Sequence, residues 1–90
     1  MFKNLEELVK IIRDRKSNPQ ENSYTNKLLN DKKLSLSKVK EEIKELIEAV
    51  EKDTNKVHEA ADVLYHLLVY LENNNVKIED VLDELQKRKK

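Results

Sequence analysis

The amino-acid sequence predicts an all-α fold, a small antiparallel bundle of four main helices that is completed by dimerisation. The chain of 90 residues contains no glycine and one proline, so few residues interrupt a helix. Apolar residues recur three and four positions apart along four long segments, which is the period of an amphipathic helix. The length predicts a single domain over residues 1–90. A chain this short buries limited apolar surface by itself, which favours an oligomer.

The first predicted helix covers residues 2 to about 16 and is followed by a break. Its apolar residues repeat at helical spacing, namely Phe2, Leu5, Leu8, Val9 and Ile12. Residues 17–22 form a turn-rich segment that contains the only proline, and a short helical piece is predicted over residues 26–30. A break of this length in a small helical protein is either a flexible connector or a binding loop.

Two long helices are predicted next, over residues 35–51 and 56–72, and a last helix over residues 78–89. Ser35 or Ser37 is expected to cap the first of them, because a serine hydroxyl accepts a hydrogen bond from the free backbone N–H groups of a helix start. The expected apolar stripe of helix 35–51 is Leu36, Val39, Ile43, Leu46, Ile47 and Val50. That of helix 56–72 is Val57, Ala60, Ala61, Leu64, Leu67, Leu68 and Leu71, and the last helix is expected to present Val81, Leu82 and Leu85 to the bundle.

The helix over residues 56–72 is apolar nearly all round in its later turns. Val63, Val69 and Tyr70 extend its apolar surface beyond the stripe. A helix of that kind is buried on most sides. Because one small bundle has too few helices to cover it, the sequence predicts a homodimer.

Four carboxylates occupy matched positions on the two central helices. Glu42 and Glu45 are three residues apart, as are Glu59 and Asp62, so each pair projects from one helix face. In a poorly solvated groove, two carboxylates would repel by about 3 kcal/mol at roughly 5 Å and an effective dielectric of about 20. A hard divalent cation removes that cost, and oxygen ligands suit Mg²⁺ or Mn²⁺. The alternative is an ordinary solvated face, where most carboxylates of helical proteins lie.

Composition excludes several other classes of function. Eighteen basic and eighteen acidic residues cancel, so there is no electrostatic footprint for nucleic acid. The absence of cysteine excludes disulfides and thiolate metal sites and agrees with a cytoplasmic location. No signal peptide or membrane span is expected. A di-iron bundle requires Glu-x-x-His, but Asn55 precedes His58 and Val63 precedes His66 at that spacing.

The order Glu41-Glu42-x-x-Glu45 followed by Glu59-x-x-Asp62 resembles the signature of the all-α nucleotide pyrophosphatases. Within them, the chain resembles the phosphoribosyl-ATP pyrophosphohydrolase family over nearly its whole length. The residues that carry this closer likeness are Arg15, Ser23-Tyr24-Thr25, Lys38-Val39, the run from Glu59 through Tyr65-His66 to Val69, and Leu85 with Arg88.

The resemblance implies hydrolysis of phosphoribosyl-ATP to phosphoribosyl-AMP and pyrophosphate, the second step of histidine biosynthesis, by a homodimer that uses Mg²⁺, with Mn²⁺ as a substitute. It also implies roles for individual residues. Metal ligands would be Glu42, Glu45, Glu59 and Asp62; Glu41 would orient the surroundings or act as the base; and the substrate would meet Arg15, Ser23, Tyr24, Thr25, Lys38, His66 and Arg88. Two other functions remain open at this point. They are a sibling pyrophosphatase that acts on (d)NTPs and a non-catalytic helical dimerisation module.

Overall fold

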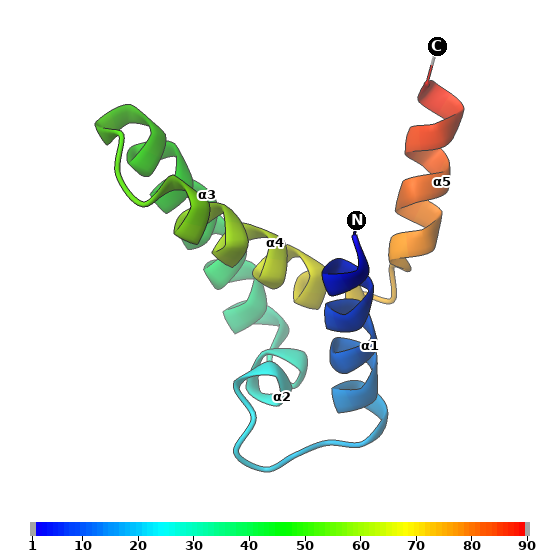
Figure 1. Cartoon of the computed structure of the whole chain (residues 1–90). Coiled ribbons are helices and arrows are strands. Elements are labelled where there is room, and N and C mark those ends of the chain that lie inside the picture. The colour runs from blue at the N-terminus through cyan, green and yellow to red at the C-terminus, as the bar shows by residue number, and fades with distance from the viewer. Residues whose placement is uncertain (1, 90) are drawn as a thin grey trace.

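The computed structural model describes residues 2–89 and consists there of five helices without strands (Figure 1). They are α1 (Lys3–Ser17), α2 (Tyr24–Leu29), α3 (Lys32–Lys52), α4 (Lys56–Asn73) and α5 (Ile78–Arg88). The predicted all-α class with four long helices is therefore confirmed. Among the described residues, none of these helices is long and apolar enough to cross a membrane.

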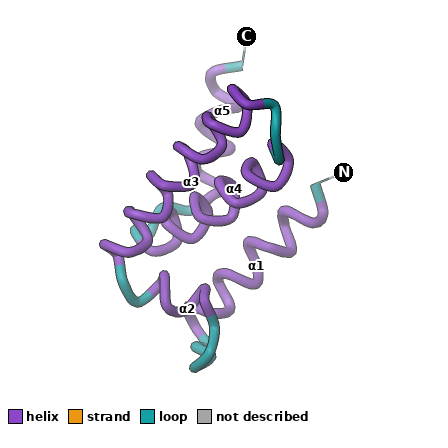
Figure 2. The backbone as a smooth tube through the Cα atoms, turned by 90° about the vertical axis from the view of Figure 1, so that its left-hand side faces the viewer, coloured by secondary structure: helices purple, strands orange, loops and turns teal. Residues whose placement is uncertain are grey.

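Helix α4 is the centre of the molecule and contacts each of the other four helices. It returns antiparallel along α3, while α1 and α2 pack on its C-terminal half (Figures 1 and 2). The buried core consists of Ile12, Leu28, Leu68 and Val69, which come from α1, α2 and α4. This core holds the short helix α2 against α4. A helix of six residues is not stable alone and requires such packing.

The turns that connect the helices use left-handed residues although the chain has no glycine. Asp53 and Asn55 flank the turn between α3 and α4 with φ of 55° and 42°, and Asn75 follows α4 with φ of 59°. Asparagine and aspartate tolerate this conformation better than other residues with a Cβ atom. The turn at 53–55 brings α4 back beside α3, and this sets which carboxylates face one another.

Helix α3 begins at Lys32, three residues before the predicted start, so neither Ser35 nor Ser37 is its cap. The cap is Asp31, whose carboxylate accepts a hydrogen bond from the Leu34 N–H at 3.0 Å. Aspartate is as good a helix cap as serine, and here it lies where the chain leaves α2. Ser35 is instead buried inside the helix.

The apolar surfaces of α3 and α4 are distributed differently from the prediction. Val69 is fully buried within the protomer, so it does not extend an outer surface, and Val63 and Tyr70 are half-buried. The residues left exposed are instead a row on α3 and a shorter row on α4. These exposed apolar rows are Leu36, Ile43, Ile47 and Val50 on α3, and Leu64 and Leu67 on α4, and Val57 in the first turn of α4 is also exposed.

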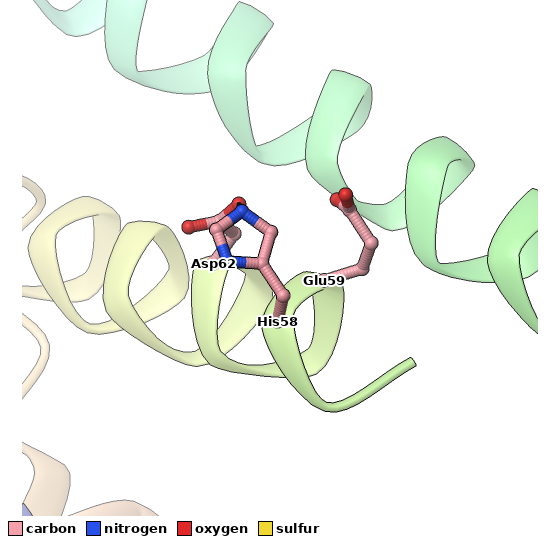
Figure 3. A group of neighbouring side chains, drawn as sticks. All are labelled: His58, Glu59 and Asp62. Carbon is pink, nitrogen blue, oxygen red and sulfur yellow. Dashed lines mark ion pairs between the residues drawn. The ribbon is translucent and has the colours of Figure 1, made fainter. Parts of the chain in front are cut away.

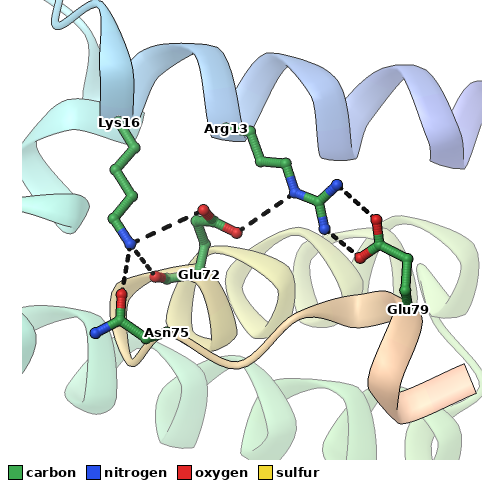
Figure 4. A network of polar contacts seen from close by, with 5 residues as sticks. All are labelled: Arg13, Lys16, Glu72, Asn75 and Glu79. Atoms are coloured by element: carbon green, nitrogen blue, oxygen red, sulfur yellow. Dashed lines mark hydrogen bonds and ion pairs between the residues drawn. The ribbon is translucent and has the colours of Figure 1, made fainter.

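Helix α5 projects away from the other helices (Figure 1), and the prediction that Leu82 and Leu85 face the bundle is wrong. These two leucines are 52% and 57% exposed, and α5 contains no fully buried residue. Helix α4 is the only described helix whose backbone approaches α5. Polar contacts of Arg13 and Lys16 supplement this packing where α1 meets the segment between α4 and α5 (Figure 4).

Candidate metal centre and substrate loop

Three of the four predicted metal ligands meet between α3 and α4. Glu42 and Glu45 of α3 and Glu59 of α4 each offer one carboxylate oxygen, and these oxygens lie within 4.8 Å of one another. The matched spacing on both helices produces this arrangement once the turn at 53–55 makes the helices antiparallel. An open pocket of about 170 Å³ borders Glu45 and Glu59 at the turn end of the hairpin.

Two oxygens of this cluster are buried without a hydrogen-bond partner among the described residues, Glu42 Oε2 and Glu59 Oε2. Glu42 is only 7% exposed. Burial raises the pKa of the Glu42 carboxyl, and the hydrogen bond and charge of Glu45 raise it further. Burial likewise raises the pKa of Glu59, with Glu45 again adding to the effect. A buried, unpaired carboxylate oxygen is costly, and a divalent cation with oxygen ligands compensates for that cost.

Asp62, the fourth predicted ligand, lies one turn further along α4 and faces His58. The distance between His58 Nε2 and Asp62 Oδ2 is 3.4 Å. His58, Glu59 and Asp62 form a second group with ligand atoms within 4.8 Å, and Figure 3 shows His58 beside Asp62 while Glu59 points toward α3. Sequence reasoning gave His58 no role. The signal was its position four residues before Asp62, which places the two side chains on one face of a helix.

His66 is buried and connects the acidic cluster to residues 17–25, which we name the substrate loop because they carry the candidate residues Ser23, Tyr24 and Thr25. Its Nδ1 lies 2.8 Å from the backbone carbonyl oxygen of Asp62, and its Nε2 lies 3.0 Å from the hydroxyl of Tyr24. Both ring nitrogens therefore have partners within the protein. Tyr65, the neighbour of His66, pairs its hydroxyl with Thr25 Oγ1. Sequence reasoning gave Tyr65 no role, because this contact joins residues from two helices that only the fold brings together.

Lys38 and Glu41 lie on α3 outside the carboxylate cluster and pair with each other at 3.2 Å. The hydrogen bond and charge of Glu41 raise the pKa of Lys38. Tyr24 lies within the electrostatic reach of Lys38. Burial raises the pKa of the Tyr24 hydroxyl, and the positive charge of Lys38 opposes that shift. The contact that fixes the Lys38 side chain is its ion pair with Glu41.

Asn26 organises the substrate loop between α1 and α2. Its side chain accepts a hydrogen bond from the Gln20 N–H and donates one to the Arg15 carbonyl oxygen, each at 2.7 Å. Its own N–H is capped by Ser23 Oγ at 3.2 Å. These contacts hold the candidate residues Arg15 and Ser23 near each other. The guanidinium of Arg15 makes a long contact of 3.5 Å with Asp14.

Arg88 is the one predicted substrate residue that lies apart from this group. It belongs to α5, where it pairs with Glu84 at 3.0 Å. Helix α5 has no contact with α3, which carries Glu42 and Glu45, and its C-terminal end lies on the opposite side of the molecule from α3 in Figure 1.

The sequence was compared with known protein families. Residues 5–89 match the family model described as phosphoribosyl-ATP pyrophosphohydrolase. The phosphoribosyl-ATP pyrophosphatase of Clostridium novyi is 47% identical over 96% of this chain and 81% of its own length. That of Clostridium acetobutylicum is 49% identical over 93% of this chain and 79% of its own length. A histidine biosynthesis bifunctional protein of Prochlorococcus marinus is 43% identical over 92% of this chain, which spans 38% of that longer relative. The chain belongs to the phosphoribosyl-ATP pyrophosphohydrolase family.

Proposed function

We propose that this protein hydrolyses phosphoribosyl-ATP to phosphoribosyl-AMP and pyrophosphate, the second step of histidine biosynthesis. The observation that carries the proposal is the cluster of Glu42, Glu45 and Glu59, in which buried carboxylate oxygens lack a partner within the described residues. The relatives named phosphoribosyl-ATP pyrophosphatase support the choice of substrate. A cytoplasmic location belongs to the same proposal, since nucleotides and Mg²⁺ are solutes of the cytoplasm.

Glu42, Glu45, Glu59 and Asp62 would hold the metal ion, which we propose to be Mg²⁺ with Mn²⁺ as a substitute. Their oxygens are the hard ligands that both ions prefer, and the buried oxygens of Glu42 and Glu59 offer a place for positive charge. When bound, the ion would neutralise negative charge on the oxygens of a polyphosphate and would activate a water molecule for attack.

The remaining candidate residues would bind and orient the substrate. Lys38 offers an ammonium group beside Tyr24, and Arg15 offers a planar guanidinium that suits two phosphate oxygens at once. Ser23, Tyr24 and Thr25 would contact the ribose or phosphate groups. Glu41 would either serve as the base that takes a proton from the attacking water or hold Lys38 in place through their ion pair.

A homodimer is part of this proposal, and its support is the pair of exposed apolar rows. A second copy of the chain would cover Ile43, Ile47 and Val50 of α3 together with Leu64 of α4, which are between about two-fifths and three-fifths exposed in the protomer. Exposed apolar residues gathered on two adjacent helices are typical of a subunit interface. We propose Arg88 as a substrate residue that would reach a site across such an interface, since α5 does not approach α3 of its own protomer.

The decisive experiment measures pyrophosphate release from phosphoribosyl-ATP and from a panel of dNTPs, with and without Mg²⁺. The proposal expects metal-dependent release from phosphoribosyl-ATP at a kcat/KM well above that for every dNTP. Preference for a dNTP would instead identify a sibling pyrophosphatase. No release from any of these substrates, together with no stabilisation by Mg²⁺, would point to a non-catalytic dimerisation module.

A further inference from the structure

We propose that Tyr65 is a positioning residue, which holds the Thr25 and Tyr24 end of the substrate loop for phosphoribosyl-ATP. The inference rests on the proposed function, because it assumes that this loop meets the substrate. Two adjacent residues of α4 hold two adjacent residues at the start of α2. Tyr65 pairs with the Thr25 hydroxyl, and His66 pairs with the Tyr24 hydroxyl at 3.0 Å.

The aromatic rings of Tyr24, Tyr65 and His66 form one packed group. The rings of Tyr24 and Tyr65 stack with centroids 6.3 Å apart and planes 22° apart. The ring of His66 stands edge-on to Tyr65 at 5.0 Å and to Tyr24 at 5.9 Å. These distances and orientations are the favourable ones for aromatic pairs. Tyr65 therefore holds Tyr24 through its ring and Thr25 through its hydroxyl.

The backbone of Asp62 determines the tautomer of His66. A carbonyl oxygen only accepts hydrogen bonds, so the Nδ1 atom that faces it must carry the ring proton. When the ring is neutral, Nε2 is an acceptor and the Tyr24 hydroxyl donates to it. In that state the Tyr24 oxygen has no second proton to donate, so it accepts from a ribose hydroxyl and does not donate to a phosphate oxygen.

Helix α2 depends on these contacts because it has only six residues. Its buried side chain Leu28 anchors the later part, whereas Tyr24 and Thr25 in the first turn are partly exposed. Without the Tyr65 hydroxyl, Thr25 would lose its side-chain hydrogen bond to α4, while Tyr24 would keep its contacts with His66 and with the Tyr65 ring. Binding of the substrate would then have to order this turn, which weakens binding without changing the hydrolytic step.

The kinetic test compares Tyr65→Phe, which removes only the hydroxyl of Tyr65, with the control Tyr70→Phe. Tyr70 is a half-buried tyrosine of the same helix whose hydroxyl forms no hydrogen bond to another described residue. Loss of this hydrogen bond in Tyr65→Phe is expected to raise KM for phosphoribosyl-ATP by about five-fold, with kcat and the Mg²⁺ requirement within about two-fold of wild type.

Hydrogen exchange gives a second measurement that does not depend on the identity of the substrate. Amides of residues 20–27 should exchange faster in Tyr65→Phe and Thr25→Val, while amides of α3 and those of Tyr70→Phe keep the wild-type rates. If wild type releases no pyrophosphate from phosphoribosyl-ATP, the proposed function fails while the exchange result still tests the contact. An unchanged KM in Tyr65→Phe, or wild-type exchange rates for residues 20–27 in that variant, would overturn the role of Tyr65.

Discussion

Glu42 is the strongest candidate metal ligand, because its carboxylate is buried beside other carboxylates. Replacing it with glutamine keeps its shape and removes its charge. We expect Glu42→Gln to be at least as stable as wild type without metal, since repulsion with Glu45 is relieved. Pyrophosphate release should fall by more than about 100-fold, since even changes to the partners of metal ligands cost 10- to 100-fold.

Thermal melting with and without Mg²⁺, alongside pyrophosphate release, measures both effects. Glu51→Gln is the matched control, because Glu51 is an exposed glutamate of the same helix. It should retain activity and stabilisation by Mg²⁺. A Glu42→Gln variant with full turnover would remove this residue from the metal site.

The raised pKa of Glu42 also predicts how stability depends on pH without metal. A carboxyl whose pKa is higher in the folded state than its ordinary value of 4.5 binds its proton more tightly when folded. Its stabilising contribution is complete below pH 4.5 and is lost as the pH rises through the higher, folded-state pKa. The wild-type melting temperature should therefore fall over that range in a chelator. The fall should be smaller in Glu42→Gln, and a saturating concentration of Mg²⁺ should reduce it in wild type.

At the residue scale, the sequence was most informative where chemistry repeats at helical spacing. The spacing of Glu42 and Glu45 predicted that they share a helix face, and the structure brings their oxygens together with one of Glu59 on the next helix. The contact between Tyr65 and Thr25 had no such signal, because neither residue type nor spacing specifies a partner on another helix. Whether a given glutamate is buried was equally hidden, since Glu41 and Glu42 are adjacent and only Glu42 is enclosed.

Among the helices, α5 is held in a different way from the rest. The guanidinium of Arg13 on α1 pairs with both oxygens of Glu79 at the start of α5, and its Nε lies 3.7 Å from Glu72 of α4 (Figure 4). Lys16 adds hydrogen bonds to the Glu72 carbonyl oxygen at 3.0 Å and to the Asn75 side chain at 2.8 Å. The base of α5 is thus fixed by these polar contacts together with Ile78, which packs against the core, whereas α2 is fixed by the core itself.

This arrangement predicts that acid loosens α5. The hydrogen bond from Arg13 lowers the pKa of Glu79 to about 2. A lowered pKa gives stability that is complete above the ordinary value of 4.5 and is lost as the pH falls toward about 2. Hydrogen exchange of α5 amides should accelerate over that interval in wild type.

Two variants check the cause of that change. In Glu79→Gln the exchange of α5 should already be fast at neutral pH and should change less with acid. In Arg13→Lys the charge is kept but the two-pronged contact is lost, so an intermediate result is expected. If α5 exchanges at the same rate in wild type and Glu79→Gln, the ion pair does not hold the helix.

Helix boundaries and helix environments differed in how well the sequence predicted them. All four long helices were predicted from periodicity, but α3 starts earlier because Asp31 caps it. The pattern of α5 correctly predicted an amphipathic helix. The prediction that its apolar side faces the bundle was wrong, because Leu82 and Leu85 are exposed. Periodicity identifies an apolar face, but it does not say whether that face meets the same chain, a second copy or solvent.

For the whole molecule, the exposed apolar rows lead to a prediction about the oligomeric state. Ile47 lies in the row of α3 and is 54% exposed in the protomer. A charge placed inside a subunit interface is strongly unfavourable. Ile47→Glu should therefore sediment as a monomer at micromolar concentrations at which wild type is a dimer.

The control for this prediction is Ile11→Glu, because Ile11 is a similarly exposed isoleucine, at 48%, on α1. It should remain a dimer. Circular dichroism would verify that both variants keep their helix content. A folded wild-type monomer at high concentration, or an Ile47→Glu dimer, would count against an interface on the exposed apolar rows.

The absence of glycine leaves room for engineering a more heat-resistant protein. Asn55 adopts a left-handed conformation at the turn before α4, and its side chain makes no capping hydrogen bond. A left-handed conformation costs a residue with a Cβ atom about 1–2 kcal/mol, and glycine avoids this cost. Glycine loses more backbone freedom on folding, which takes back about 0.5–1 kcal/mol of that gain in stability. Asn55→Gly should therefore raise the melting temperature slightly while activity is kept. Asn75→Gly should gain less, because the Asn75 side chain accepts a hydrogen bond from Lys16 that glycine cannot replace. A chain that turns with asparagine therefore has room to gain thermal stability at the turn itself.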